Sequence, residues 1–125
     1  MSYNIDTCKV KKLENFVIPV KSIYKTENKN WIPNQPKILN IETNEVSISM
    51  GCGQQIKGVL KDGMIHVSKM EISGEGSGSL MHEVLMPAFK DSKGEFDAVL
   101  VWEGGDSISR LTVKDGKVEE TDVEL

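Results

Sequence analysis

A chain of 125 residues can bury a core without disulfides or metal ions, and we expect a single domain over residues 1–125. A composition of 38% hydrophobic and 27% charged residues excludes a disordered chain. The net charge of −4 gives no general reason to bind nucleic acid.

The first third of the chain predicts short elements and a long loop. Residues 9–13 are expected to form a short edge strand, because lysines at an edge discourage pairing between sheets. A short helix near 18–25 follows, with Pro19 in its first turn, and an extended segment over 15–20 is the rival prediction. Residues 26–37, TENKNWIPNQPK, are typical of a loop, and they include Trp31.

Two hairpins and a helix are predicted in the middle of the chain. Segments 38–42 and 45–50 flank Thr43-Asn44, and segments 56–60 and 64–72 flank a turn that contains Asp62-Gly63. The stretch GEGSGS over 74–79 then predicts a flexible joint. Residues 79–90 follow a helical apolar spacing, and Pro87 should kink or end that helix near its last turn.

The C-terminal quarter gives the clearest structural signal. Runs at 95–103, 107–114 and 117–125 are separated by Gly104-Gly105-Asp106 and by Asp115-Gly116, which predicts a three-stranded antiparallel meander. The first strand has apolar residues on both faces, which predicts a central position in its sheet. One face carries Phe96, Ala98, Leu100 and Trp102, and the other carries Asp97, Val99, Val101 and Glu103. In the last strand, alternation predicts a buried face of Thr121, Val123 and Leu125 opposite a wet face of Glu120, Asp122 and Glu124.

Together these elements predict an α+β fold in a single domain. It consists mainly of an antiparallel sheet of about six or seven strands that ends in the meander. One main helix near 79–90 and a short helix near 18–25 complete it.

The termini and the cysteines bear on location. The start MSYNIDTCKVKK is not typical of a signal peptide, because no apolar core follows the charges. No run approaches the ~20 apolar residues of a membrane span. Cys8 and Cys52 are too few for a disulfide framework, so we expect free thiols and a cytoplasmic protein without membrane contact.

No motif reaches a catalytic or metal-binding signature. The glycine-rich 74–79 segment lacks the lysine of a phosphate-binding loop, and His82-Glu83 lacks a second histidine at position 86. Cys52 between glycines is a candidate nucleophile only if a histidine lies near it. We therefore predict no enzyme activity, no catalytic residues, no cofactor and no metal.

Charge distribution supplies the functional hypothesis. Residues 1–37 hold seven basic and three acidic side chains, whereas residues 91–125 hold four basic and ten acidic ones. The acidic end predicts a small protein that neutralises a basic protein partner, such as an inhibitor or an immunity protein against a toxin nuclease. The side chains expected to bind that partner are Glu103, Asp106, Glu119, Glu120, Asp122, Glu124 and, as an apolar anchor, Trp31.

Two alternatives stay open at this point. One is a small enzyme or ligand-binding domain with its site near Cys52, His82 and the 74–79 loop. The other is a β-module that self-associates through an exposed edge, which would make a homo-oligomer. A nucleic-acid partner is not expected, because the lysines of the first segment are scattered and no arginine accompanies them.

Overall fold

The computed structural model describes residues 4–25, 33–51, 53–105 and 107–123. Its main feature is one antiparallel sheet of eight strands in the order β2-β3-β4-β5-β1-β6-β7-β8. The strands are β1 (Ile5–Pro19), β2 (Lys37–Asn40), β3 (Glu45–Ser49), β4 (Gln55–Lys61), β5 (Met64–Glu71), β6 (Lys93–Trp102), β7 (Ile108–Lys114) and β8 (Lys117–Val123). The predicted antiparallel sheet is confirmed, with eight strands in place of six or seven.

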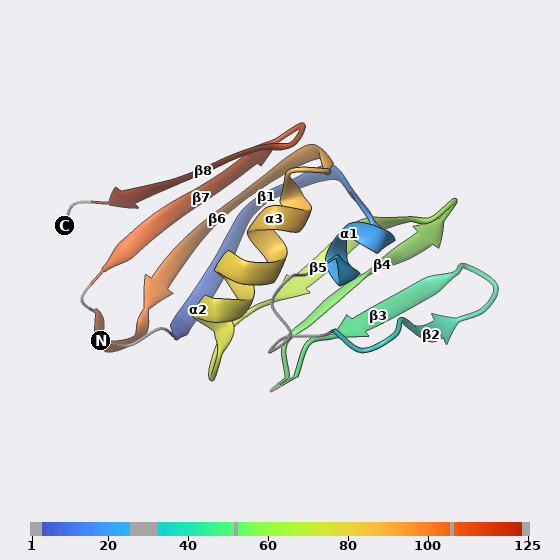
Figure 1. Cartoon of the computed structure of the whole chain (residues 1–125), viewed down its shortest axis with the longest axis horizontal. Helices are drawn as coiled ribbons and strands as arrows, with labels where there is room; N and C mark the ends of the chain where they lie inside the picture. Colours follow the sequence, from blue (N-terminus) through green and yellow to red (C-terminus); the bar gives the residue numbers. More distant parts are fainter. Residues whose placement is uncertain (1–3, 26–32, 52, 106, 124–125) are drawn as a thin grey trace.

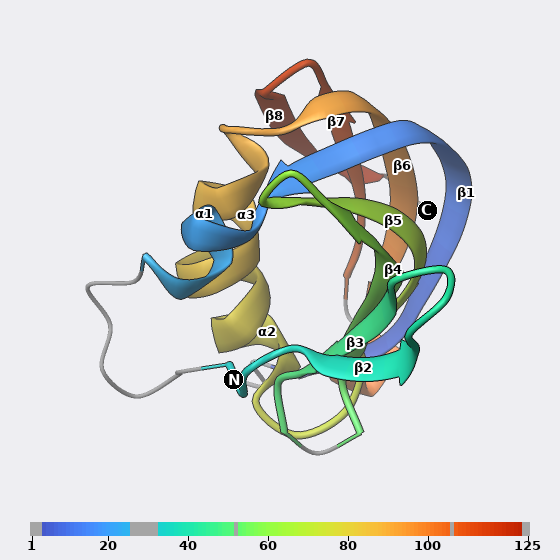
Figure 2. The same cartoon turned by 90° about the vertical axis from the view of Figure 1, so that its right-hand side faces the viewer.

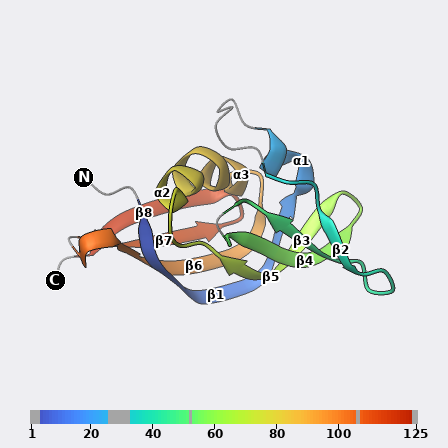
Figure 3. The same cartoon turned by 90° about the horizontal axis from the view of Figure 1, so that it is seen from below.

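The sheet curls around a helical segment that runs from α2 (Ser77–Leu80) to α3 (Met86–Phe89), with the short helix α1 (Val20–Tyr24) beside it. β8 and β2 lie at the two margins, and the helical segment crosses the middle of the sheet (Figure 1). Seen at right angles, the strands bend around one side of that segment (Figure 2), which lies on one face of the sheet only (Figure 3). The sheet therefore has an inner face that packs on the helix and an outer face that is open to solvent.

The N-terminal strand corrects the sequence prediction. β1 is not a short edge strand over 9–13 but a strand of 15 residues between β5 and β6. It pairs with β6 from Ile5 to Val17 and with β5 from Val17 to Pro19. The lysines of this strand were interpreted as the sign of an edge. They lie on the open outer face, where a central strand tolerates charge as well as an edge strand does. Helix α1 (Val20–Tyr24) follows directly, so each rival prediction for 15–25 holds for part of the segment.

The predicted helix near 79–90 is present but is not uniform. It consists of α2 (Ser77–Leu80), a π-helical turn η1 (Met81–Leu85) and α3 (Met86–Phe89). Pro87 explains the wide turn, because proline cannot donate to the carbonyl four residues earlier and its ring crowds that carbonyl. The residue before it, Met86, donates its N–H to the Met81 carbonyl, five residues earlier, which is the hydrogen bond of a π-helical turn. Within the described residues, no helix is long and apolar enough to cross a membrane.

The predicted turns are confirmed at two hairpins. Asp62-Gly63 joins β4 to β5, and Asp115-Gly116 joins β7 to β8, with positive φ at all four residues. Both residues of a type I′ turn need positive φ, which suits the right-handed twist of the strands on either side. The C-terminal meander therefore forms as the turn signals indicated, with β6, β7 and β8 paired in sequence order.

All three phenylalanines of the chain meet in the core. Phe16 of β1 lies 5.4 Å, between ring centroids, from both Phe89 of α3 and Phe96 of β6. Phe89 and Phe96 are 5.6 Å apart, and each of the three side chains is at most 1% exposed. This cluster ties the N-terminal strand, the helical segment and the C-terminal meander together.

Truncating Phe16 tests the weight of this cluster. Phe16→Ala should lower the free energy of unfolding by about 3–5 kcal/mol, because it leaves a cavity among rings that cannot collapse into it. Phe16→Leu should cost clearly less, because it keeps most of the apolar volume. Urea unfolding followed by circular dichroism measures both, and equal losses for the two variants would contradict the packing described.

Candidate functional site

β8 is the outermost strand at the acidic end of the sheet. Its register with β7 pairs Leu111 with Glu120 and Ser109 with Asp122. Because Leu111 and Ser109 are buried on the inner face, Glu120 and Asp122 are on the inner face too. The sequence prediction had the two faces of this strand reversed: the outer face carries Glu119, Thr121 and Val123, and Val123 is 42% exposed.

The inner face of β8 is joined to the helix by a polar network. The Trp102 Nε1–H donates to Ser109 Oγ at 3.0 Å, and the Ser109 hydroxyl donates to Glu120 Oε2 at 2.8 Å. The other carboxylate oxygen of Glu120 lies 3.1 Å from His82 Nε2, on the π-helical turn. The imidazole of His82 stacks on the Trp102 ring with centroids 5.5 Å apart and planes 12° from parallel. These contacts close a ring of four side chains.

The order of groups in the network indicates positioning and not nucleophilic catalysis. In a catalytic triad the histidine lies between the hydroxyl and the carboxylate, whereas here Glu120 lies between Ser109 and His82. Ser109 is 1% exposed, and its hydroxyl is already used as both donor and acceptor. The network holds the Glu120 carboxylate in place and ties the helix to the edge strand.

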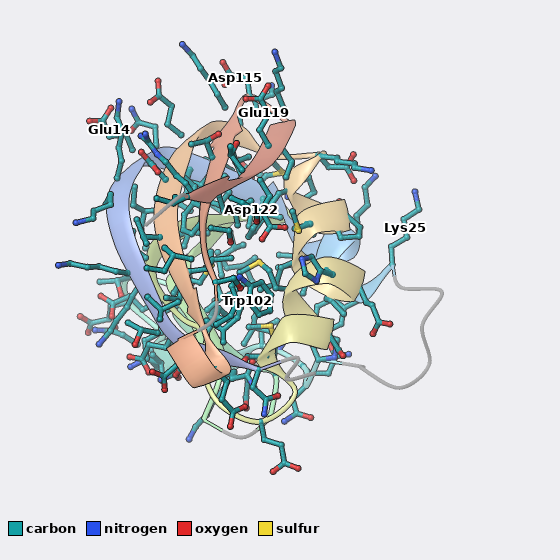
Figure 4. The ribbon with its side chains drawn as sticks, turned by 90° about the vertical axis from the view of Figure 1, so that its left-hand side faces the viewer. Glu14, Lys25, Trp102, Asp115, Glu119 and Asp122 are labelled. Atoms are coloured by element: carbon teal, nitrogen blue, oxygen red, sulfur yellow. The ribbon has the colours of Figure 1, made fainter. Side chains whose placement is uncertain are left out.

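Asp122 and Glu119 are the carboxylates of β8 that remain exposed. Figure 4 shows Trp102 and Asp122 on the side of the sheet that faces the helical segment, while Glu14 of β1 points away from it. Within the described part of the chain, Asp122 makes no ion pair or side-chain hydrogen bond. Glu119 lies 3.4 Å from Lys117, and both side chains are exposed, so this pair contributes little.

The outer face beside β8 carries ion pairs that the sequence did not reveal. Arg110 of β7 donates from Nε at 3.1 Å and Nη2 at 2.6 Å to the carboxylate of Asp97 on β6. Lys12 of β1 lies 2.6 Å from Glu95 of β6. These four residues line part of an open groove of about 420 Å³, and their charges already satisfy one another.

The remaining predicted site residues are spread out. Glu103 begins the 3-10 turn η2 (Glu103–Gly105) beyond β6, and its backbone N–H donates to the Asn4 carbonyl. Asp106, Glu124 and Trp31 lie outside the described residues. The structure thus brings Glu119, Glu120 and Asp122 onto one strand but divides them between its two faces.

The glycine loop is occupied by structural contacts. Its groups bond to the start of β1: the Gly76 N–H donates to Asn4 Oδ1, and Ser77 Oγ accepts from the Ile5 N–H at 2.6 Å. Ser77 Oγ lies 2.6 Å from the Gly74 carbonyl, to which it donates. The loop therefore clamps the N-terminal strand, and these amides are not directed at a ligand.

The described residues also bear on thiol and metal chemistry. Cys8 is a free cysteine, and burial raises the pKa of its thiol to about 11, so it is a poor nucleophile near neutral pH. Cys52 lies outside the described residues. Among the residues that the structure describes, no group of three or more histidine, cysteine and carboxylate side chains is arranged to hold a metal ion.

Comparisons with models of protein families, with curated proteins and with solved structures found no match for this chain.

The polar network was missed, although one signal could have located it. Counting back from the two-residue turn Asp115-Gly116 pairs Glu120 with Leu111, and hence assigns Glu120 to the apolar face of the meander. Ser109 interrupts that face in the sequence, and a polar residue on an apolar face needs a partner. The role of His82 could not be predicted, because it depends on how the helix lies across the sheet.

The Asp97–Arg110 pair predicts a pH-dependent contribution to stability. Hydrogen bonds from Arg110 hold the pKa of Asp97 below its ordinary value of 3.8. A lowered folded-state pKa adds stability that is complete above the unfolded-state value and is lost as pH falls through the folded-state value. Asp97→Asn should therefore cost about 0.5–1 kcal/mol at pH 7, and the two unfolding curves should converge as pH falls below 3.8. A difference that persists in acid would contradict this origin, and Glu14→Gln on the same face should have little effect at either pH.

The buried hydroxyl of Ser109 gives a second test. Ser109→Ala should lower the free energy of unfolding by about 1–3 kcal/mol, because the Trp102 N–H loses its acceptor and Glu120 loses a donor. In a Trp31→Phe background, Trp102 is the only tryptophan of the chain. Its fluorescence then reports the loss of the hydrogen bond to Ser109. Ser68→Ala is the matched control: its exposed hydroxyl only reaches the Lys57 carbonyl, so it should cost less than about 0.5 kcal/mol.

Proposed function

We propose that this chain is a small cytoplasmic binding protein that neutralises a basic protein partner, in the manner of an inhibitor or an immunity protein that blocks a toxin nuclease. The observation that supports the proposal is the position of the β8 carboxylates. They lie on the outermost strand, and Glu119 and Asp122 are exposed on its two faces. Such a role needs a stable scaffold and a charged surface, and no chemistry of its own.

The fold leaves the acidic charge at the margin of the sheet. Three of the seven lysines of the basic first segment lie in β1, beside β6, and one of them, Lys12, pairs with Glu95 of that strand. β8 is separated from β1 by two strands. It carries three carboxylates against Lys117, which leaves a net charge of −2 over seven residues. Charge is therefore partly cancelled in the centre of the sheet and retained at its acidic edge.

A charged margin of this kind favours fast association with a cationic surface. Complementary charge raises the association rate and selects the partner, and the effect weakens as salt screens it. Val123 adds an exposed apolar side chain on the same strand, and partial burial of such a group slows dissociation. The competing interpretation is that the acids only prevent edge-to-edge aggregation, and it predicts no dependence of any binding on them.

The proposal can be tested by affinity capture from source cells, in which the wild-type protein and a variant with reversed charge on β8 serve as the two baits. Wild-type bait should retain a basic protein that elutes as salt is raised, and a Glu119→Lys, Asp122→Lys double variant should lose it. With the purified partner, the variant should associate at least about tenfold more slowly at low salt, because steering by charge is reversed. Circular dichroism should show an unchanged fold, since both side chains are exposed.

The control makes the same change of charge at the opposite margin. Glu42→Lys with Glu45→Lys alters exposed side chains in the β2–β3 turn and at the start of β3, and it should retain the partner almost as well as wild type. Equal behaviour of the two double variants would mean that only net charge matters. Retention of an acidic partner, or unchanged association for the β8 variant, would refute the proposed function.

A further inference from the structure

We infer that β8 takes the partner as an added strand. The added segment runs antiparallel to β8 along its outer edge, and it carries basic side chains at alternate positions beside Asp122 and Glu120. This inference rests on the proposed function, and it adds the mode of binding and the sequence pattern of the partner.

Of the two margins of the sheet, β8 is the better template. β8 pairs with β7 over seven consecutive residues without a break in register. β2, at the opposite margin, has only four residues, follows Pro36, and has a register break between Ile38 and Asn40. Short, bulged edge strands next to proline resist pairing with another chain, whereas a long regular edge offers a row of backbone donors and acceptors.

The hairpin turn determines which backbone groups of β8 point outward. The two residues of a type I′ turn are flanked by a hydrogen-bonded pair, here Lys114 and Lys117, and pair types then alternate along the ladder. Val118, Glu120 and Asp122 consequently stand in non-hydrogen-bonded pairs, with N–H and C=O directed away from β7. The exposure of Glu120 agrees with this direction of its backbone groups. Its side chain is only 23% exposed, but the residue as a whole is exposed, so its backbone faces solvent.

The same three residues carry the inner-face side chains. An added antiparallel strand would form hydrogen-bonded pairs with them, and its side chains opposite Glu120 and Asp122 would lie on the inner face. Basic residues two positions apart would therefore meet both carboxylates. Intervening residues would lie beside Glu119, Thr121 and Val123 on the outer face, where β-branched side chains fit best.

Asp122 is the stronger of the two cation contacts. The Glu120 carboxylate is shared between Ser109 and His82, so its charge is partly satisfied within the protein. Asp122 is an exposed residue, and its carboxylate has no such partners in the described part of the chain. Arginine is preferred over lysine opposite it, because a guanidinium can engage a carboxylate with two parallel hydrogen bonds.

Synthetic peptides test this arrangement with the intact protein. The peptide TRTRTRT alternates arginine with threonine. The control TRRTTRT has the same composition and charge, but no two of its arginines are two positions apart. Isothermal titration calorimetry at low salt should show about threefold tighter binding of the alternating peptide, because only that peptide can place arginines opposite both Glu120 and Asp122. Asp122→Asn should remove most of that advantage, while Glu119→Gln on the outer face should leave most of it.

Backbone methylation separates strand addition from simple charge attraction. In the antiparallel arrangement the arginine N–H groups face β8 and the threonine N–H groups face solvent. N-methylation at the arginines should abolish binding of the alternating peptide, and N-methylation at the threonines should be tolerated, although both peptides keep their charge.

The outcomes distinguish this inference from the proposed function. Equal affinity for the two arginine orders, insensitivity to methylation, or no binding of either peptide would overturn strand addition. The proposed function is judged separately by the natural partner and the charge-reversed bait, and it would survive if the partner still bound through Glu119 and Asp122 in another geometry.

Discussion

The structure depends on the pairing of β1 with strands on both of its sides. β6 follows most of its length and β5 takes its last residues. The change of partner occurs near Asn15, whose φ of 47° is unusual for a residue other than glycine. Gly94 makes this possible, because a Cβ there would collide with the Asn15 carbonyl. Strands β2 to β5 and the meander are thus joined into one sheet by a single strand.

Local chemistry made much of this fold predictable. Asp62-Gly63 and Asp115-Gly116 mark turns that require positive φ, and each lies where a hairpin closes. The helical segment followed from its apolar spacing and Pro87. The position of β1 could not be inferred in this way, because the pairing of Ile5 with Trp102 joins residues at opposite ends of the chain. The lysines at positions 9 and 12 pointed to an edge only because the openness of the outer face was not known.

The candidate site shows the same division between local and distant causes. That β8 is exposed and acidic followed from its composition, whereas the direction of Glu120 depended on register. Alternation alone gives two faces without saying which one is inward, and charge suggested the wrong choice. Glu120 can face inward because Ser109 and His82 satisfy its carboxylate there. An acid on the inner face is therefore explained by partners from β7 and the helix.

The phenylalanine cluster also has a consequence for synthesis of the protein. Phe16 leaves the ribosome long before Phe89 and Phe96 exist, and the chain grows at roughly 5–20 residues per second. For several seconds the nascent β1 has neither its β6 partner nor its ring contacts, and its apolar residues Ile5, Phe16 and Ile18 stay uncovered. Strand β1 must therefore be kept from aggregating until β6 has been synthesised. A chain released before β6 would expose these apolar residues to chaperones and proteases.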